Sequence, residues 1–452
     1  MDNDWAYNEI IGAKLWDPRC YHNLARACQL LAENAGLSLS RALGSVRKSV
    51  SRILHHEKVT PQDLLRGHIQ ATARRCRGLP RVLVASDTTF FNFTSHSAVE
   101  GLGPIGDSST AKGALLHSAL AMAEDGTPLG LVYQQSWARD PAQAGAAKRR
   151  RKRAYADKES AKWLQTLQAI EKALPKEVPV LLLQDREADV FAFFAAPRRP
   201  GLDLLIRMAH PHRVVVGGEG APTHLQEALL RAPIEASLTV VVCLRPAQPQ
   251  REARLSLRRV LVAVCPPRND PAPKPAPVWL WAVAATEERP PEGVAGIGWF
   301  LLTTLWVPDS ETAGALVADY ARRSRIEAFH YVLKSGLGFE RLQVDTLLGL
   351  QKALSVFSIV AWRLLHVLYL ARHTPQAPAT EAVSFAERRV LEEVEGAPIQ
   401  TVAQVVLAVA KLAGFRPLPS APRPGVKSLW LGWRKLADVV FGYQLATSRP
   451  AP

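Results

Sequence analysis

The sequence predicts an α/β protein in which a central α/β domain is flanked by helical domains at both ends. Two observations predict this fold class. Apolar residues recur at helical spacing before residue 78 and after residue 373. Between these segments, short apolar runs alternate with helical periodicity, and from about 211 to 308 the pattern is purely that of strands. Because 452 residues exceed what one core usually holds, we expect three domains, 1–78, 79–372 and 373–452, with a β insertion at about 211–308.

The composition is that of a basic globular protein. Hydrophobic residues make up 48% and charged residues 21% of the chain, which argues against general disorder. Lys and Arg outnumber Asp and Glu by 56 to 41, giving a net charge of +15. This excess favours a polyanionic partner, with nucleic acid ahead of a membrane surface. The five cysteines form no CxxC pair and are expected to be reduced thiols, neither a disulfide framework nor a zinc site.

Neither a signal peptide nor a membrane span is expected. The first nine residues, MDNDWAYNE, are acidic and lack an apolar core. The longest apolar run, at about 353–370, is interrupted by Arg363 and His366, so it is expected to be a buried helix. The sequence therefore predicts a cytoplasmic protein.

The first 78 residues are expected to be entirely helical. Residues 24–35 and 39–54 have helical spacing, and Gly36 separates them. The second segment carries four basic residues, Arg41, Arg47, Lys48 and Arg52. A basic helix of this kind either enters a DNA groove or forms the solvated face of a small bundle, and the sequence leaves both readings open.

The order of elements after residue 80 indicates a particular core. The run RVLVAS ends at Asp87, the run VPVLLLQ ends at Asp185, and the turn signal 124–126 marks a hairpin between two other strands. The expected elements are strands at 81–86, 114–123 and 129–137, a helix at 158–174, a strand at 178–184, a helix at 187–194 and a strand at 202–208. This is the order of a ribonuclease-H-like core, in which acidic residues stand at strand ends.

The insertion and the basic run come next. Four strands are expected at 237–245, 255–265, 278–285 and 298–306, with a Pro-rich surface loop at 266–277. A run of six basic residues, Lys148 to Arg153, precedes the 158–174 helix. It either holds DNA backbone or is a solvated loop.

The stretch YARRSRIEAFHYVLK, from Tyr320 to Lys334, is expected to be one helix. One exposed stripe would carry Tyr320, Arg323, Glu327 and Lys334, and the opposite face would carry Ile326, Phe329 and Leu333. A carboxylate among two cations and a phenol suits a site for an anion and a metal together. A solvated face with i,i+4 ion pairs is the alternative.

The C-terminal part is expected to be helical. A long helix is expected at 347–373, and two further helical stretches at 402–415 and 429–443 are joined by a Pro-rich segment. The second stretch places Leu429, Trp433 and Leu436 at helical spacing. That face is either core or a partner surface.

Three carboxylates, Asp87, Asp185 and Glu327, come from elements that meet in such a core. Three acids so placed can hold two divalent cations about 4 Å apart, which is the arrangement that catalyses in-line phosphoryl displacement. Hard oxygen ligands suit Mg²⁺ or Mn²⁺. Taken singly, an Asp at a strand end is more often a turn or helix cap.

These residues carry a family resemblance. SDTTF around Asp87, DREADVF from Asp185 and the Y-x2-R-x3-E-x6-K spacing of 320–334 resemble the cut-and-paste bacterial DDE transposases of the insertion-sequence-four family. The likeness continues in KESAKWL, GWFLLT, RIEAFH, AKLAGF and LWLGW. It covers nearly the whole chain and is most specific from about 80 to 340.

The resemblance implies roles for eight residues. Asp87, Asp185 and Glu327 would be the catalytic, metal-binding triad for two Mg²⁺ or Mn²⁺ ions. Tyr320, Arg323 and Lys334 would contact DNA phosphates near the cleavage site. Arg207 would approach the scissile DNA, or is a surface Arg at a strand end. Trp299 would stack on a flipped base, or is a core tryptophan.

The resemblance also implies a reaction and partners. The reaction would be nicking at transposon ends, hairpin formation and opening, and strand transfer to target DNA. The partners would be double-stranded DNA and a second copy of the chain, with the C-terminal helices forming the homodimer interface. The protein would be nucleoid-associated when bound to DNA. A catalytically inactive DNA-binding relic or transposition inhibitor, and a plain ribonuclease-H-like nuclease, are the alternatives.

Overall fold

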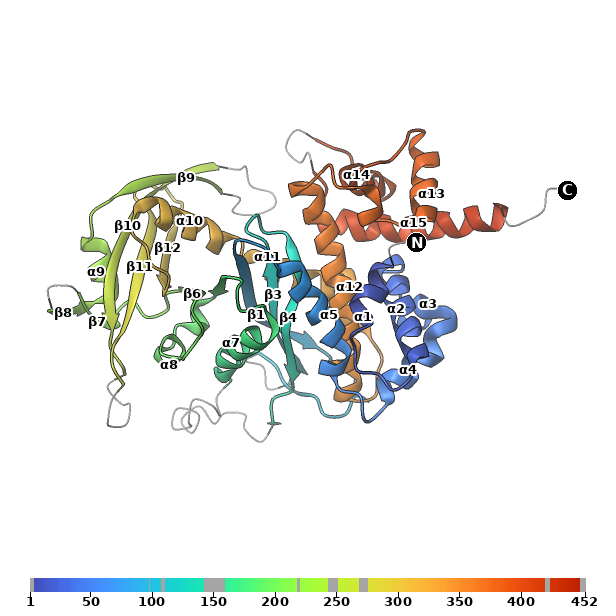
Figure 1. Ribbon diagram of the computed structural model, residues 1–452, viewed down its shortest axis with the longest axis horizontal. Helices are drawn as coiled ribbons and strands as arrows, with labels where there is room; N and C mark the ends of the chain where they lie inside the picture. Colours follow the sequence, from blue (N-terminus) through green and yellow to red (C-terminus); the bar gives the residue numbers. More distant parts are fainter. Residues whose placement is uncertain are drawn as a thin grey trace.

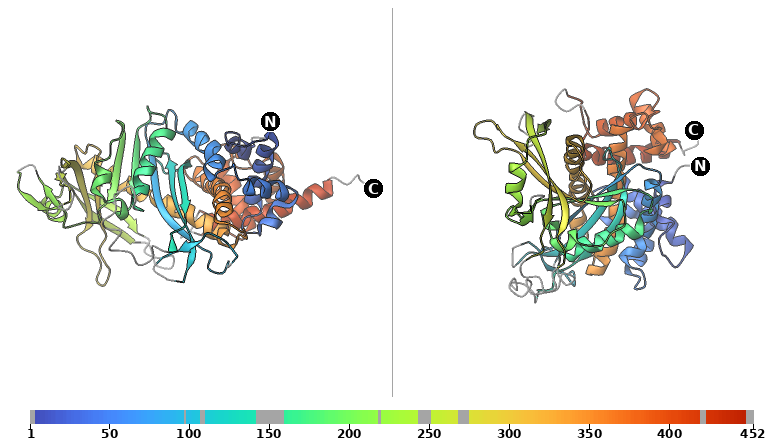
Figure 2. Two further views of the ribbon diagram at one scale, coloured as in Figure 1. Left: turned by 90° about the horizontal axis from the view of Figure 1, so that it is seen from below. Right: turned by 60° about the vertical axis from the view of Figure 1, so that its left-hand side comes forward.

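The computed structural model describes residues 4–96, 98–106, 110–141, 159–217, 220–242, 251–267, 275–418 and 423–447. It is a mixed α/β structure built on one large mixed sheet. Figure 1 shows the sheet running through the molecule, with helices from both ends of the chain gathered at one side. Seen from below in Figure 2, the same helices lie at one end of the long axis and the inserted strands at the other.

The N-terminal part is helical, as the sequence predicts. Asp17 caps one helix through the amide of Arg19, and Thr60 forms a capping box with Asp63 before another. One expectation is wrong. The helix expected over 39–54 is broken at Gly44, whose φ of +49° lies in the left-handed region. The helices are α1 (Trp5–Ile10), α2 (Pro18–Glu33), α3 (Leu39–Leu43), α4 (Arg47–His55) and α5 (Pro61–Cys76).

The central strands have the order β4-β3-β1-β5-β6. Their bounds are β1 (Val82–Asn92), β3 (Lys112–Met122), β4 (Pro128–Trp137), β5 (Val180–Gln184) and β6 (Leu202–Arg207), and a short β2 (Gly103–Pro104) flanks β3. β1, β5 and β6 are parallel to one another, whereas β3 is antiparallel to both β1 and β4. Two helices, α7 (Ala161–Ala173) and α8 (Phe191–Phe194), follow β4 and β5 in the chain.

The inserted strands continue this sheet. β12 pairs with β6, so the insertion extends the core sheet and does not stand apart from it. The expectation of a purely β insertion is also wrong, because a helix, α9 (Leu225–Arg231), lies within it. The strands are β7 (Val214–Val216), β8 (Pro222–His224), β9 (Ala236–Val242), β10 (Arg251–Val264), β11 (Val278–Glu287) and β12 (Gly298–Thr303).

The stretch 320–334 is not one helix. α10 (Ser310–Ala321) ends before Arg322, α11 (Ser324–Tyr331) begins two residues later, and a π-helical turn (Val332–Gly336) follows. The predicted apolar face is confirmed, because Ile326, Phe329 and Leu333 are fully buried. Single π-helical turns are frequently found at functional sites, so this segment is a candidate for one.

The long helix expected over 347–373 is confirmed as α12 (Leu347–His373). Among the described residues it is the one helix long and apolar enough to cross a membrane, and 83% of its most apolar window is buried inside the protein. It contacts α5, β4 and α2, so it joins the N-terminal helices to the sheet.

The C-terminal part contains α13 (Phe385–Glu395), α14 (Val402–Leu412) and α15 (Val426–Thr447), of which α13 was not expected. Leu429, Trp433 and Leu436 are buried in this chain, so the first of the two predicted readings, a core face, is confirmed. The free end of α15 projects beyond the other helices (Figure 1).

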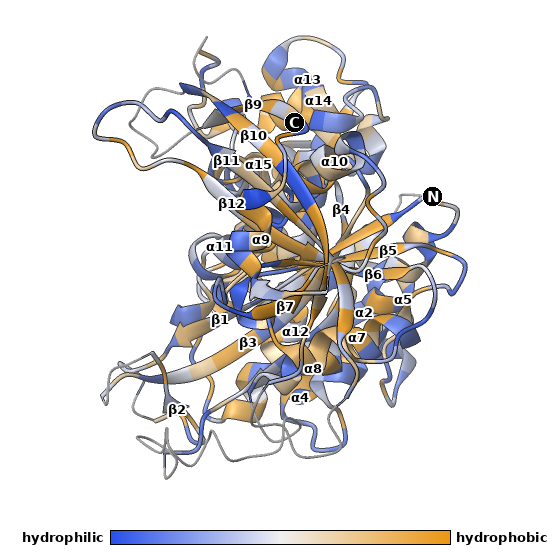
Figure 3. Cartoon of the chain, turned by 90° about the vertical axis from the view of Figure 1, so that its left-hand side faces the viewer, coloured by the Kyte–Doolittle hydropathy of each residue, from blue (hydrophilic) through white to orange (hydrophobic). Residues whose placement is uncertain are grey.

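Apolar side chains fill the two faces of the sheet separately. One cluster joins the N-terminal helices, α10, α11, α12 and the C-terminal helices, and includes Leu83 and Ala85 of β1. The other lies against α7 and α8 and includes Val82 and Val84 of the same strand. This alternation is the period-two pattern of a strand buried on both faces, and Figure 3 shows much of the sheet in hydrophobic colours.

Candidate active site

Asp87 lies inside β1, whereas the sequence predicts it at the end of a strand. β1 pairs with β5 only from Val82 to Ala85, whereas its pairing with β3 continues to Asn92. Asp87 is therefore two residues beyond the last pair with β5, at the edge where the parallel strands end. Open α/β sheets bind their ligands at this carboxyl edge. The Asp87 side chain is 20% exposed there.

Asp185 directly follows β5 at the same edge. Its Oδ1 accepts a hydrogen bond from the backbone N–H of Glu187 at 2.9 Å, so it caps a 3₁₀ turn over Arg186–Ala188. This is the capping role that an Asp at a strand end commonly has. The cap fixes one carboxylate oxygen of Asp185, and the strand positions that carboxylate one strand away from Asp87.

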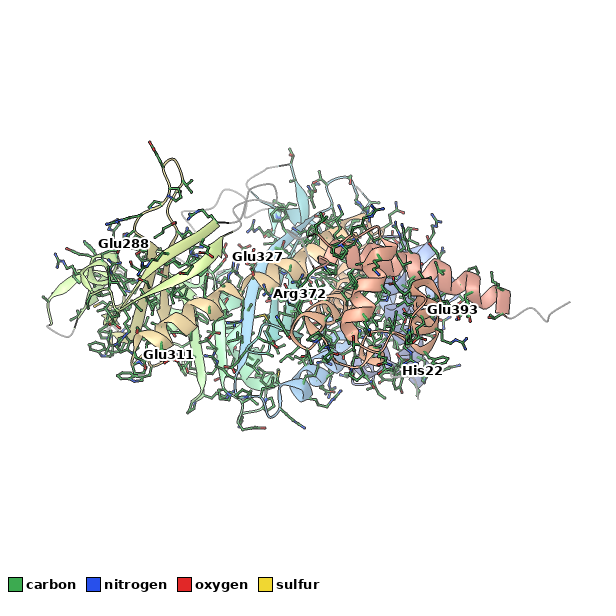
Figure 4. All side chains as sticks on the ribbon, turned by 90° about the horizontal axis from the view of Figure 1, so that it is seen from above. His22, Glu288, Glu311, Glu327, Arg372 and Glu393 are labelled. Atoms are coloured by element: carbon green, nitrogen blue, oxygen red, sulfur yellow. The ribbon has the colours of Figure 1, made fainter. Side chains whose placement is uncertain are left out.

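Glu327 approaches the same edge from α11. Figure 4 shows it near the middle of the molecule, on the helical run that begins near Glu311. Its side chain is 58% exposed and accepts a hydrogen bond from Nη2 of Arg323 at 2.8 Å. Nη1 of Arg323 lies 3.8 Å from Oδ1 of Asp87. The guanidinium of Arg323 therefore lies between two of the three predicted acids.

The three carboxylates interact electrostatically. Burial raises the pKa of Asp87 to about 6; Arg323 opposes this rise, and the charges of Asp185 and Glu327 add to it. Burial also raises the pKa of Asp185, with Glu187 acting in the same direction and Arg323 against it. Like charges held together in a partly buried site disfavour their own ionisation, and a cation relieves that cost. In this arrangement Arg323 is that cation.

Tyr320 and Trp299 lie on the β6–β12 side of the acids. Tyr320 is only 6% exposed on α10, so the expectation that it shares an exposed stripe with Glu327 is wrong. The break between α10 and α11 is the physical reason, because it changes the direction in which the side chains point. The Trp299 ring packs edge-on against Tyr320 with centroids 6.5 Å apart. Trp299 is half-buried, so its burial lies between that of an exposed base-stacking ring and that of a core tryptophan, the two predicted alternatives.

Arg207 ends β6 on the same side. It is opposite Leu301 of β12, and its side chain is partly buried. Burial lowers the pKa of its guanidinium, and the nearby cations Arg186 and Arg323 lower it further. Arg207 and Arg323 together lower the pKa of Tyr320 against the effect of burial, which raises it. The structure therefore brings a phenol and two arginines to one side of the acids.

Lys334 lies on the other side, in the π-helical turn. Its Nζ is 4.8 Å from the ring centroid of Phe90 and 5.8 Å from that of Phe91, both on β1. Burial lowers the pKa of its ammonium group, while Glu340 and Asp87 oppose this shift. All eight residues singled out from the sequence thus lie along one edge of the sheet.

A buried polar layer behind the acids was missed by sequence reasoning. Ser86 and Gln184 directly precede the two aspartates and are hydrogen-bonded to each other. On the next strand, Nδ1 of His117 is 2.9 Å from the Thr88 hydroxyl, and its Nε2 is 2.9 Å from the hydroxyl of Thr166 on α7. A polar residue inside an otherwise apolar strand was the available signal, because such a side chain needs a buried partner.

His330 was also missed. It is 5% exposed on α11, its Nδ1 lies 3.8 Å from Oδ2 of Asp87, and its Nε2 has no hydrogen-bond partner among the described residues. Burial lowers the pKa of its imidazole to about 3, so the ring is neutral at ordinary pH. The motif RIEAFH held the signal, since His330 is three residues after Glu327 and therefore on a neighbouring face of the helix.

Lys162 adds a cation beside Asp185. It lies in the first turn of α7, is 8% exposed, and donates a hydrogen bond to Oε2 of Glu187 at 2.9 Å. The basic run at 148–153 that precedes this helix lies outside the described residues.

The donor set is chemically suited to a hard divalent cation. Carboxylate oxygens are the ligands that Mg²⁺ and Mn²⁺ prefer, and burial disfavours the charged form of Asp87, which a bound cation would favour. The described side chains do not form a ready cage, since no group of three or more His, Cys, Asp or Glu side chains among them is close enough to hold a metal ion. Arg323 occupies the space between Asp87 and Glu327.

No protein-family model matches the chain. Among solved structures, the piggyBac transposase synaptic complex with hairpin DNA is similar over 99% of this chain and 78% of its own, at 9% sequence identity and a TM-score of 0.37. A similarity of this size establishes neither a common fold nor a common activity.

Proposed function

We propose that the protein is a DDE-type DNA transposase that cuts and joins DNA by metal-dependent phosphoryl transfer at transposon terminal repeats. One observation carries the proposal. Asp87 on β1, Asp185 after β5 and Glu327 on α11 lie at the carboxyl edge of the parallel strands, where the charges of Asp185 and Glu327 act on Asp87 and Arg323 lies between Asp87 and Glu327. Three acids from three elements at such an edge suit phosphoryl transfer better than they suit a structural ion pair.

The strand arrangement supports a ribonuclease-H-like core. Three parallel strands, β1, β5 and β6, are continued by the antiparallel β3 and β4 on the β1 side. The proposed core is completed by α7, α11 and α12. In this arrangement the helix that carries Glu327 returns to the sheet after the long β insertion, which brings the third acid to the first two.

The side chains around the acids suit a phosphodiester. Arg323 and Arg207 offer planar donors that bind phosphate oxygens in pairs, and Lys334 offers a compact positive charge. Tyr320 offers a phenol donor that burial keeps protonated. An incoming phosphate competes with Glu327 and Asp87 for the guanidinium of Arg323. DNA binding would in this way release both carboxylates at the moment when they are needed.

Asp87, Asp185 and Glu327 would hold two Mg²⁺ or Mn²⁺ ions. When bound, such ions activate water or a 3′-hydroxyl and stabilise the leaving oxygen. Trp299 would receive a base flipped from the duplex, for which its half-buried ring beside Tyr320 is suited. A second copy of the chain, docked through the C-terminal helices, would complete the complex on two DNA ends in the cytoplasm.

The second candidate is a catalytically inactive DNA-binding protein. It is favoured by the ion pair between Arg323 and Glu327 and by the lack of a ready metal cage among the described residues. In that case Arg323 would neutralise the acids permanently. The protein would then bind DNA through its basic residues without cutting it. The two candidates differ in one measurable respect, which is whether DNA is cut.

The test uses a supercoiled plasmid that carries the inverted repeats flanking the gene. Wild type is expected to release the intervening DNA with hairpin ends when Mg²⁺ is added, and Glu327→Gln and Asp185→Asn are expected to abolish release. Glu311→Gln is the matched control, since Glu311 is an exposed glutamate on the adjoining helix α10 (Figure 4) and should cut normally. Binding by wild type without cutting would favour the inactive candidate.

A further inference from the structure

Phe90 is an exposed aromatic residue beside the proposed active site. It follows Asp87 by three residues on β1 and is 46% exposed, whereas its neighbour Phe91 is fully buried. An exposed aromatic ring offers a flat face on which a nucleic-acid base can stack. Nζ of Lys334 lies near both rings, and the buried Phe91 ring also packs against the ring of Phe339 with centroids 4.9 Å apart.

The position of Phe90 follows from how β1 ends its pairing. Beyond Ala85, no described strand pairs with β1 on the β5 side, although β1 remains paired with β3 as far as Asn92. On this edge the backbone N–H of Asn92 instead donates a hydrogen bond to Oε1 of Glu340 at 2.7 Å. The π-helical turn lies along this edge and places Nζ of Lys334 4.8 Å from the Phe90 ring centroid.

A matching arrangement lies on the other side of the acids. There Trp299 packs against Tyr320, and Arg207 and Arg323 supply the positive charge. The strand order β1-β5-β6-β12 separates this group from Phe90, with Asp185 between them. The edge of the sheet thus carries an aromatic ring with a cation on each side of the carboxylates.

Cations beside exposed rings suit a nucleic-acid strand that has lost its partner. The cation binds a phosphate, and the ring stacks on the base attached to the same stretch of backbone. Stacking of this kind accepts any base, because every base has an aromatic face. A ring on each side of the acids would grip the unpaired strand on both sides of the scissile phosphate.

We propose that Phe90 is a base-stacking residue that holds an unpaired base on the side of the scissile phosphate away from Trp299, with Lys334 binding the adjacent phosphate. This inference rests on the proposed function, since it needs DNA in the site. The inference goes beyond the proposed function because it assigns a DNA contact to Phe90, which is not among the eight residues singled out from the sequence. Phe90 would act on the positioning of the strand and not on the chemistry.

The experiment measures quenching of 2-aminopurine, a fluorescent base, placed unpaired on one or the other side of a nick in a 30-base-pair duplex. Proteins are mixed with this duplex in EDTA, so that no cleavage occurs. Wild type should quench the base on both sides. Phe90→Ala should lose quenching on one side only and bind the duplex roughly tenfold more weakly, as expected for one lost stack. Phe90→Trp should keep the quenching, and Phe90→Leu should not.

Trp279→Ala is the control. Trp279 is 55% exposed near the start of β11, two residues before the partner of Thr303, and so lies toward the edge of the sheet opposite the acids. Trp279→Ala should bind and quench like wild type. Lys334→Ala should reduce the slope of the logarithm of the binding constant against the logarithm of salt concentration by about one, because one phosphate contact is lost. Phe90→Ala should leave that slope unchanged.

The outcomes separate the inference from the proposed function. Equal quenching by wild type and Phe90→Ala, or equal behaviour of Phe90→Ala and Trp279→Ala, would overturn the role of Phe90 while plasmid cutting still stands. One-sided loss in Phe90→Ala, in a protein that cuts no plasmid, would uphold the stacking and refute the transposase. Failure of wild type to bind the duplex would refute both.

Discussion

The hydroxyl of Ser86 donates a hydrogen bond to Oε1 of Gln184 at 2.7 Å, and both side chains are fully buried. Each of the two residues directly precedes an aspartate of the proposed triad. The bond therefore joins β1 to β5 at the level where the parallel pairing ends and Asp87 and Asp185 begin. The other polar atom of the Gln184 side chain, Nε2, has no hydrogen bond among the described residues. The spacing of the two aspartates thus follows from the backbone pairing of β1 with β5 up to Ala85 and from this buried polar pair directly beyond it.

Replacing Ser86 by Ala should destabilise the protein by about 1–3 kcal/mol, because Oε1 of Gln184 is then buried without a donor. Urea unfolding followed by circular dichroism measures the change. Leu in place of Gln184 removes the orphaned group, so the double variant Ser86→Ala/Gln184→Leu should recover part of the loss. A double variant whose loss equals the sum of the two single losses would show that the pair does not interact.

Asp87→Asn should stabilise the metal-free protein at neutral pH. The pKa of Asp87 is raised to about 6 in the folded state, chiefly by burial, from its ordinary value of 3.8. Between these values the folded protein holds a proton that the unfolded chain has lost, so the contribution of Asp87 to stability falls as the pH rises from about 4 to 6. A shift of this size corresponds to roughly 2–3 kcal/mol.

Asn carries no titrating proton, so the variant should match wild type near pH 4 and exceed it at pH 7. Urea unfolding in EDTA at pH 4, 5, 6 and 7 tests this. Parallel pH curves for the two proteins would contradict the raised pKa. A stabilised Asp87→Asn would mean that the site stores unfavourable charge in readiness for a ligand, a common cost of function.

The sequence predicts the end of a helix or strand when neighbouring residues determine it, and does not predict it when contacts with distant residues do. The ends of α12 follow from local signals, since Thr346 caps the first turn through the amide of Gly349 and the apolar run fills every turn to His373. The end of β1 does not follow from them. Polar residues after Ala85 look like the end of a strand, but pairing with β3 keeps the backbone extended to Asn92.

The candidate site shows the same limit. The types and spacing of Asp87, Asp185 and Glu327 were visible in the sequence, because strand ends and helical periodicity are local patterns. The break at Arg322–Arg323 was not visible, since neither Gly nor Pro marks it. The position of Arg323 between two acids arises from contacts between residues more than 200 positions apart, and spacing alone cannot supply them.

Glu9→Gln should destabilise the attachment of the N-terminal helices to the sheet. Glu9 on α1 is almost fully buried, and its carboxylate contacts Nδ1 of His68 and Nη1 of Arg75 at 2.6 Å each. Nε2 of His68 accepts a hydrogen bond from the backbone N–H of Leu131 on β4, and Arg75 lies 4.3 Å from the Trp362 ring of α12. Removing one member of such a buried pair typically costs about 3–5 kcal/mol.

The same network should make the wild-type protein sensitive to acid. Burial favours a raised pKa for Glu9, but His68 and Arg75 lower it to about 2. Burial lowers the pKa of His68. Both folded pKa values lie below those of the unfolded chain, so stability falls as the pH drops below about 6.5 for His68 and from about 4.5 towards 2 for Glu9. Limited proteolysis between pH 7 and pH 3 should release the N-terminal helices first, and equal resistance at both pH values would contradict this.

Gly432→Ala should loosen the C-terminal helices, which the proposed dimer needs. A Cβ at Gly432 of α15 would lie 1.9 Å from the carbonyl oxygen of Val409 on α14, so the two helices would have to move apart. Gly442 is the matched control, because it lies on the same helix and a Cβ there meets nothing within 4 Å. Ala at Gly442 should stabilise the helix by up to about 1 kcal/mol, through its better helix propensity.

Thermal unfolding and size-exclusion chromatography separate the two effects. Gly432→Ala should unfold at a lower temperature by several degrees, as expected for a loss of about 1–3 kcal/mol by overpacking, and should dimerise on DNA less completely. Gly442→Ala should unfold at the wild-type temperature or slightly above it. If both variants lowered the unfolding temperature equally, the close approach of α14 and α15 at Gly432 could not be the cause, because a Cβ at Gly442 meets no neighbour within 4 Å.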